Sequence, residues 1–164
     1  MKNNTVAIAF ICDNGYVIPT LTAIHSLMSN KREVTIYKIY VVTSELSESN
    51  IKLFEGHIKE NIEISVIPAN IDKIKGIHIQ EKNSHCVATE AALLKFYLPE
   101  LIDEEKILYL DGDILVQRDL LDLYNENIEC YYAGVVIDSG SIYYKHDYVK
   151  KVENYFNSGV MLLN

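Results

Sequence analysis

Runs of apolar residues alternate with amphipathic stretches along this chain, and the pattern predicts strands that alternate with helices. Short runs rich in β-branched and aromatic residues are typical of strands, and the run at 62–67 also has the period of two of a strand. The expected strands cover residues 6–11, 36–42, 62–67, 107–110, 133–137 and 160–163. Apolar residues at helical spacing predict helices at residues 19–28, 47–59, 87–97 and 120–124.

Local signals indicate several boundaries of these elements. Ser47 is a good N-cap for the helix that follows it. Pro99 is expected to end the helix at 87–97, because proline cannot continue a helix. The polar residues 69–84 are expected to form a surface loop.

This order of elements predicts an α/β fold, with a mainly parallel sheet and helices on its faces. At 164 residues the chain is long enough for a proper core, and we expect a single domain over residues 1–164. The last residues, SGVMLLN, form an apolar strand-like run, from which we expect a domain that is truncated at its C-terminus. Uncovered apolar surface at that end would favour self-association as a homo-oligomer.

The charge balance argues against one class of partner. The chain has 15 lysine and arginine residues against 23 aspartate and glutamate residues, a formal net charge of −8. Nucleic acids require a basic surface, so we expect no nucleic-acid partner. A small anionic ligand would need a local lysine or a bound cation, because the overall field opposes its binding.

The cysteines and the length of the apolar runs bear on location. Cys12, Cys86 and Cys130 are widely spaced and form no CxxC motif, so we expect the reduced thiols of a cytosolic protein. The apolar run near the start is too short for a signal peptide, and no run approaches the roughly 20 residues of a membrane span. We therefore expect a cytoplasmic protein with no transmembrane segment, and any peripheral membrane contact would come from segments outside this chain.

Residues 106–113 read KILYLDGD, an expected buried strand that ends in two aspartates separated by one glycine. Side chains two apart on a strand point the same way, so Asp111 and Asp113 should converge, and a positive group should lie between them. Carboxylate oxygens suit hard divalent cations such as Mg²⁺ or Mn²⁺, and Gly112 would let a diphosphate approach the backbone. The alternative is a solvated Asp-Gly-Asp turn.

Aspartates also follow two other expected strands. Asp13 comes after the strand at 6–11, and Asp138 comes after the strand at 133–137. In an open parallel sheet, ligands bind beyond the carboxyl ends of the strands, so Asp13, Asp111 and Asp138 should mark the active edge. For Asp138 the alternative is a turn residue, because Asp-Ser-Gly turns well unaided.

The stretch KILYLDGDILVQRDLLDLY resembles the DxD region of glycosyltransferase family 8, which includes bacterial lipopolysaccharide galactosyltransferases and glycogenin. Three more blocks resemble the family in the same order, AFICDNGYVIPTLTAIHSL, KFYLPELI and YFNSGVMLLN, so the resemblance covers essentially the whole chain. It implies a GT-A fold, a Rossmann-like α/β domain that binds a UDP-sugar through Mn²⁺ or Mg²⁺. It also implies hexose transfer with retention of configuration to a glycan, lipopolysaccharide or protein acceptor, as in bacterial polysaccharide biosynthesis.

By the same resemblance, three residues near the start of the chain should contact the base of the donor. Asp13 matches an acid that hydrogen-bonds the uracil, the backbone of Ile11 lies beside the base, and Tyr16 matches an aromatic residue that packs on it. Lys95 falls where many members have an arginine that reaches the donor, and lysine keeps the charge but not the bidentate fork. A half-buried tyrosine and a solvated helix lysine are the alternatives for Tyr16 and Lys95.

The remaining matches lie at the diphosphate and the sugar. Asp111 and Asp113 match the metal ligands, with Asp111 also near the ribose and Gly112 between them. Asp138 matches an acid at the sugar end of the site, and Asn157 matches an asparagine that contacts the sugar. Asn157 stands before Ser-Gly, so a turn residue is its alternative.

This chain departs from the family pattern at two points. Gly15 stands where some members have an asparagine that contacts the uracil. The third metal ligand of the family, a histidine in a C-terminal HxxGxxKPW-like motif, has no counterpart in this chain. The histidines that are present are expected to be surface or packing residues, namely His25, His57, His78, His85 and His146.

Two other functions fit part of the pattern. A phosphatase of the haloacid dehalogenase type also places DxD after a buried strand, but Leu115 stands where a threonine or valine normally follows. A catalytically inactive nucleotide-sugar-binding fragment is the other alternative, since the acceptor-binding portion of the family is absent.

Overall fold

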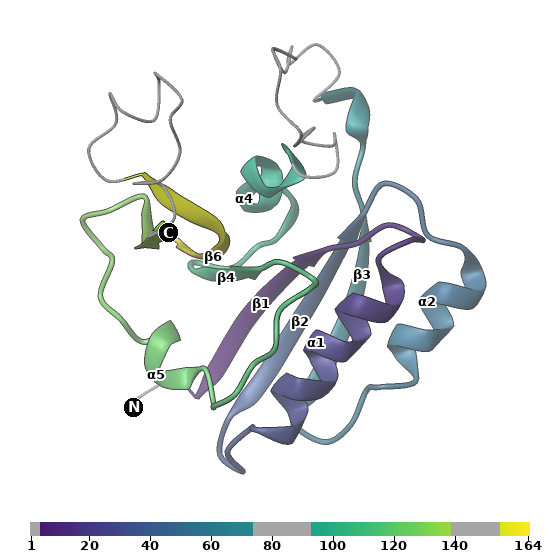
Figure 1. The fold of residues 1–164 in the computed structure, drawn as a ribbon, viewed down its shortest axis with the longest axis horizontal. Helices are drawn as coiled ribbons and strands as arrows, with labels where there is room; N and C mark the ends of the chain where they lie inside the picture. Colours follow the sequence, from purple (N-terminus) through teal and green to yellow (C-terminus); the bar gives the residue numbers. More distant parts are fainter. Residues whose placement is uncertain (1–3, 74–92, 139–154) are drawn as a thin grey trace.

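The computed structural model describes residues 4–73, 93–138 and 155–164, and the strands among them form one sheet in the order β3-β2-β1-β4-β6-β5 (Figure 1). The strands are β1 Thr5–Ile11, β2 Ile36–Thr43, β3 Ile62–Pro68, β4 Ile107–Leu110, β5 Ala133–Ile137 and β6 Phe156–Leu163. The helices are α1 Val17–Ser29, α2 Glu48–Glu55, α4 Leu98–Leu101 and α5 Leu121–Tyr124, with 3₁₀ turns η1 Ile71–Lys73 and η2 Leu94–Tyr97. All six expected strands are confirmed, although β6 begins four residues before the expected position.

The sheet is mixed, and five of its six strands run in one direction. β1 pairs in parallel with both β2 and β4, and β2 pairs in parallel with β3. β6 is antiparallel to β4 on one side and to β5 on the other, so β5 again points the same way as β4. The expected α/β fold with a mainly parallel sheet is therefore confirmed, and β6 is the single reversed strand among those described.

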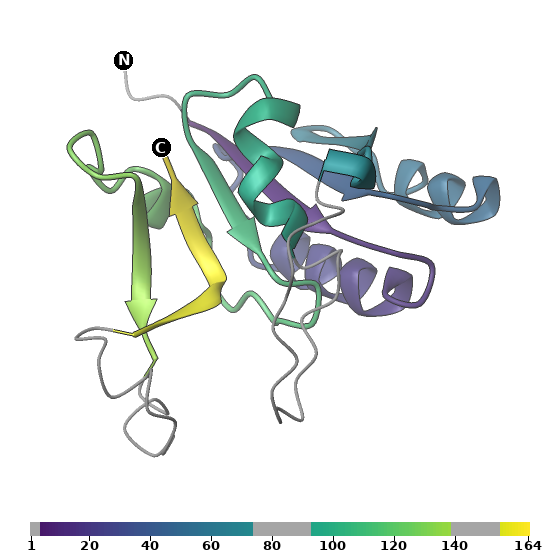
Figure 2. The same cartoon turned by 90° about the horizontal axis from the view of Figure 1, so that it is seen from above.

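Helices cover both faces of the sheet, which explains why its central strands read as continuous apolar runs (Figure 2). One core lies under α1, α2 and α5, and its buried residues include Val6, Ile8 and Phe10 of β1 with Ile24, Leu27, Phe54 and Leu121. The second core lies under η2 and α4 and includes Ala9, Leu94, Leu98, Tyr109 and Met161. Because neighbouring residues of β1 serve opposite cores, few polar positions are left in that strand.

Two helices differ from the sequence-based expectation at their ends. The Ser47 hydroxyl caps α2 by accepting from the N–H of Asn50, as expected, but the helix ends at Glu55 instead of residue 59. Gly56 follows as the C-cap, and glycine is a poor helix former. α1 begins two residues earlier than expected, at Val17, because Pro19 occupies the first helical turn, where no N–H donor is needed.

The expectation that a helix stops before Pro99 is wrong. η2 continues directly into α4, and Pro99 lies in the first turn of that helix. Proline is tolerated there because its missing N–H would have no helical partner in any case. The expected surface loop at 69–84 contains the 3₁₀ turn η1, and its residues 74–84 lie outside the described residues, as do residues 87–92 of the expected helix.

The buried carboxylate of Asp119 connects the first core to the loop that precedes β2. It accepts hydrogen bonds from the N–H of Arg32 at 2.9 Å, the hydroxyl of Tyr37 at 3.0 Å and the N–H of Leu121 at 3.0 Å. Burial acts to raise the pKa of Asp119, but the hydrogen bonds outweigh burial and the pKa lies below its ordinary value. Asp119 therefore stabilises the fold as an anion.

The variant Asp119→Asn is expected to lower the free energy of unfolding at pH 7 by about 2 kcal/mol, because an NH₂ group would replace one of two oxygens that each accept a hydrogen bond. A lowered folded-state pKa contributes stability above the unfolded-state pKa of about 3.9, and that stability is lost as the pH falls through the folded value. The deficit of the variant should thus shrink below about pH 4. Urea unfolding at pH 7 and at pH 3.5 measures both effects. The exposed Asp122, which pairs with Arg32, supplies the control Asp122→Asn, and an equal loss in both variants would contradict the assignment.

Candidate functional site

Three aspartates lie at the same edge of the sheet, beyond the carboxyl ends of parallel strands. Asp13 follows β1, Asp111 follows β4, and Asp138 follows β5, and these three strands share one direction. The N–H of Asp111 donates to the carbonyl of Gly159 at 2.8 Å, which anchors the end of β4 to β6. The three aspartates expected at strand ends therefore do lie at one side of the sheet, where the carboxyl ends of β1, β4 and β5 meet.

A buried tyrosine, Tyr109, holds the side chain of Asp111. The hydroxyl of Tyr109 donates to Oδ1 of Asp111 at 2.6 Å, and the two residues are neighbours on the same side of the chain. Tyr109 is almost fully buried, whereas the Asp111 side chain is 42% exposed. Burial first, and then this hydrogen bond and the charges of Asp111 and Asp113, raise the pKa of the Tyr109 phenol. The phenol therefore stays a hydrogen-bond donor at neutral pH.

Lys95 is a buried residue, and the alternative of a solvated helix lysine is wrong. Only 8% of it is exposed, and its ammonium donates to the carbonyl and the hydroxyl of Ser158, each at 3.3 Å. The same nitrogen lies 3.8 Å from Oδ1 of Asp111 and 4.8 Å from the ring centroid of Tyr109. A positive group thus lies beside the first aspartate of the pair, whereas the charge argument predicted one between the two.

Asp113 is held by Tyr16, the N-cap residue of α1. Its Oδ2 accepts a hydrogen bond from the hydroxyl of Tyr16 at 3.1 Å, and this bond together with the Asp113 charge raises the pKa of the Tyr16 phenol. β4 ends at Leu110 as expected, and Asp113 lies in the turn that follows, so the rule that side chains two apart on a strand point the same way does not apply to this pair. The two carboxylates still act on the same groups, since each contributes to the raised pKa of both Tyr16 and Tyr109.

Gly112 is required by the packing of this turn against α1. A Cβ atom at Gly112 would lie 2.5 Å from Oγ1 of Thr20 and 3.3 Å from the ring of Tyr16. The chain after β4 then runs alongside α1, where the N–H of Val116 donates to the Ser26 hydroxyl at 2.8 Å (Figure 1). The glycine in DGD therefore has a structural reason, in addition to the access for a diphosphate that the sequence suggests.

Asp13 organises the start of α1. Its Oδ1 accepts hydrogen bonds from the N–H groups of Gly15 and Tyr16, at 2.8 and 2.9 Å. This arrangement is the side-chain turn that aspartate commonly forms, and it fixes the segment between Ile11, the last residue of β1, and Tyr16. Tyr16 is 43% exposed, so one part of its ring faces solvent at the same edge.

The reversed strand β6 brings Asn157 to Asp111 but leaves Asp138 farther out. Oδ1 of Asn157 accepts from the N–H of Gly159 at 2.8 Å, and a Cβ at Gly159 would lie 2.6 Å from Oδ2 of Asp111 and 3.0 Å from Asn157. Asp138 follows β5, with β6 between it and β4, and its N–H donates to the carbonyl of Tyr155 at 2.9 Å. Asn157 and Asp111 therefore both lie beside Gly159, whereas Asp138 lies farther along the same edge.

Sequence reasoning missed three residues that build this site, Tyr109, Ser158 and Gly159. The signal for Tyr109 was its place two residues before Asp111, since the expected strand would put both side chains on one side. Ser158 and Gly159 stand in the YFNSGVMLLN block but had only been considered as turn residues. Their contacts depend on the pairing of β6 with β4, which no local pattern specifies.

The oxygen ligands at this edge fit a hard divalent cation. Asp111 and Asp113 contribute two negative charges, and Lys95 cancels one of them, so the group keeps a net negative charge. Mn²⁺ and Mg²⁺ are commonly bound by one or two carboxylates together with phosphate oxygens and water. Within the described residues there is no cluster of three or more histidine, cysteine, aspartate or glutamate side chains that could hold a metal ion alone.

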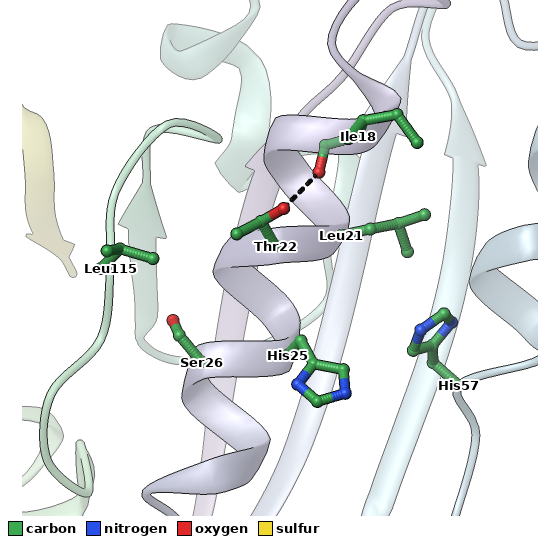
Figure 3. A pocket seen from close by; sticks show the side chains of 7 residues that line it. All are labelled: Ile18, Leu21, Thr22, His25, Ser26, His57 and Leu115. Carbon is green, nitrogen blue, oxygen red and sulfur yellow. Dashed lines mark hydrogen bonds between the residues drawn. The ribbon is translucent and has the colours of Figure 1, made fainter.

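A separate hollow lies on the outer face of α1 and contains none of the expected site residues (Figure 3). It is lined by Ile18, Leu21, Thr22, His25, Ser26, His57 and Leu115. The rings of His25 and His57 meet edge to face with centroids 6.4 Å apart, and Nδ1 of His57 lies 2.8 Å from the carbonyl of Leu53. This agrees with the expected surface or packing role of both histidines.

Among the described helices, none is long and apolar enough to cross a membrane.

Comparisons with known proteins find relatives that match nearly the whole length of this chain. The chain is similar to glycosyltransferase GlyF of Streptococcus pneumoniae (27% identity, 96% of this chain, 36% of that protein) and to general stress protein A of Bacillus subtilis (28% identity, 99% and 57%). The crystal structure of the galactosyltransferase LgtC with donor and acceptor sugar analogues superposes with a TM-score of 0.82 at 26% identity, over 97% of this chain and 58% of LgtC. The chain thus has the GT-A fold and spans between 36% and 58% of the length of these three proteins.

The model of the family described as Glycosyl transferase family 8 matches residues 7–164, and the chain therefore belongs to glycosyltransferase family 8.

Proposed function

We propose that this chain is the donor-binding part of a retaining hexosyltransferase, which transfers a hexose from a UDP-sugar to a glycan, lipopolysaccharide or protein acceptor. The observation that carries the proposal is the pair Asp111 and Asp113 at the carboxyl edge of a family 8 domain, where Tyr109 hydrogen-bonds the first carboxylate and Tyr16 the second. LgtC, which was solved with donor and acceptor sugar analogues, supports this class of substrate. Free cysteines, the buried Cys12 and the exposed Cys130, favour a cytoplasmic location.

Asp111 and Asp113 would hold Mn²⁺ or Mg²⁺, which when bound neutralises the negative charge that develops on a departing diphosphate. The chain's own residues prepare the site for this charge. Lys95 adds a fixed positive charge behind Asp111, and the two tyrosine hydroxyls keep one oxygen of each carboxylate engaged. A site that is already oriented loses less entropy when the ligand binds.

The base end of the donor is proposed to lie against the segment from Ile11 to Tyr16. Asp13 uses Oδ1 for the turn, and its other oxygen is the acceptor that would meet the N–H of a uracil. The exposed part of the Tyr16 ring offers a surface on which the base would stack. The backbone of Ile11 would line the other side of the base.

The sugar end is proposed to lie toward Asn157 and Asp138. Asn157 directs its Oδ1 to the N–H of Gly159, so its amide nitrogen is the group that would donate to a sugar hydroxyl. Asp138 would position the sugar as an acceptor of hydroxyl hydrogen bonds. We assign the nucleophilic role to neither residue.

The variants Asp111→Asn and Asp113→Asn are each expected to weaken Mn²⁺-dependent UDP binding at least about 100-fold, since even the partners of metal ligands contribute about 10- to 100-fold. Isothermal titration of UDP in the presence and absence of Mn²⁺ measures the loss. Asp122→Asn removes an exposed carboxylate on α5 and should titrate like the wild type. Unchanged titration of both DxD variants would remove the proposal.

Gly159→Ala is expected to weaken the same binding about 10-fold, because the new methyl group would lie 2.6 Å from Oδ2 of Asp111 and must displace it. Gly134→Ala, in β5, is the matched control, since a Cβ there would meet Ile128 at 3.3 Å and Leu162 at 3.6 Å, away from the site. Equal affinities for the two alanine variants would show that the Asp111 carboxylate is not confined by Gly159.

A catalytically inactive nucleotide-sugar-binding domain is the second candidate, and the observation in its favour is that the chain spans between 36% and 58% of the length of GlyF, general stress protein A and LgtC. UDP release from UDP-glucose or UDP-galactose by this chain, compared with a longer form of the protein, separates the two. Turnover by the 164-residue chain would exclude the inactive alternative. No observation favours a phosphatase once the family is established.

A further inference from the structure

The two oxygens of Asp111 have different surroundings. Oδ1 accepts the Tyr109 hydroxyl at 2.6 Å and faces the Lys95 ammonium at 3.8 Å. Oδ2 lies on the side of Gly159, where a Cβ atom would come within 2.6 Å of it. Contacts to Oδ1 therefore orient the carboxylate, and the lack of a side chain at Gly159 leaves room for Oδ2.

Lys95 is fixed on the Oδ1 side by partners of its own. Its ammonium donates to the carbonyl and hydroxyl of Ser158 and lies over the ring of Tyr109. Because only 9% of the Lys95 side chain is exposed, its position is fixed by the surrounding packing. The lysine and the tyrosine thus form one buried unit beneath Asp111.

We propose that Tyr109 is a positioning residue for the cation site: with Lys95 it holds Oδ1 of Asp111 inward, so that Oδ2 is the oxygen presented to a divalent cation. This inference rests on the proposed function and specifies how one of its ligands is oriented. Tyr109 itself touches neither cation nor donor in this scheme.

The physical basis is the freedom of a carboxylate about its last torsion. That torsion is broad and roughly two-fold in aspartate, so an unsupported carboxylate samples many orientations. A hydrogen bond to an ionised acceptor is about twice as strong as a neutral one, and a buried phenol is itself fixed by packing. Tyr109 is suited to this task because β4 is buried on both faces and the Tyr109 ring is packed within the second core.

Tyr124 provides a closely matched control. Its hydroxyl also donates at 2.6 Å, to the carbonyl of Lys106, and the Lys106 ammonium lies 5.2 Å from its ring centroid. Tyr124→Phe therefore removes a tyrosine hydrogen bond of the same length beside a lysine, but one whose acceptor is a neutral carbonyl instead of a carboxylate. The bond lies at the opposite end of β4 from Asp111.

The experiment compares Mn²⁺ binding to the wild type, Tyr109→Phe, Tyr124→Phe and Asp111→Asn in the presence of UDP, with free Mn²⁺ measured by electron paramagnetic resonance. Tyr109→Phe is expected to bind Mn²⁺ about 10-fold more weakly than the wild type, because a charged hydrogen bond is lost. Tyr124→Phe should bind like the wild type, even if both phenylalanine variants lose similar thermal stability. Circular dichroism confirms that each variant is folded.

The outcomes separate this inference from the function on which it rests. Normal Mn²⁺ binding by Tyr109→Phe, with loss of binding in Asp111→Asn, would overturn the positioning role and leave the proposed function intact. Equal weakening in both phenylalanine variants would also overturn it, since the effect would then follow from general destabilisation. Equal binding by the wild type and Asp111→Asn would overturn the proposed function itself.

Discussion

The repulsion between two carboxylates at the end of a buried strand is the constraint around which this edge of the molecule is built. Asp111 and Asp113 are separated by one residue, and each is hydrogen-bonded by a tyrosine from a different side of the sheet edge. Lys95 supplies one buried positive charge but leaves the group net negative. The group therefore remains able to attract a cation.

The topology of the sheet makes this arrangement possible. Parallel strands bring the segments after β1 and β4 together, so Tyr16 of the first segment reaches Asp113 of the second. The reversed strand β6 then enters at the same edge, which places Asn157, Ser158 and Gly159 beside Asp111. Residues far apart in the chain become one site because of strand direction. Gly112 and Gly159 have no side chain, so the neighbouring segments can approach them closely.

The sequence predicted the parts of this structure that depend on local pattern. All six strands and the edge marked by Asp13, Asp111 and Asp138 follow from apolar runs and their polar ends. The position of Pro99 inside a helix was not predicted. A proline that ends one helix and a proline in the first turn of the next helix give the same local signal. The burial of Lys95 and its contact with Tyr109 depend on how η2 packs over the sheet, which no spacing along the chain determines.

The central claim is that a divalent cation lies between the aspartate pair and the diphosphate of the donor. Anomalous diffraction from crystals grown with UDP and Mn²⁺ tests it most directly. The account predicts a manganese peak within about 2.0–2.6 Å of carboxylate oxygens of both Asp111 and Asp113, and also near the diphosphate. Bound UDP with no manganese peak at these side chains, or with the two carboxylates turned away from the diphosphate, would contradict it.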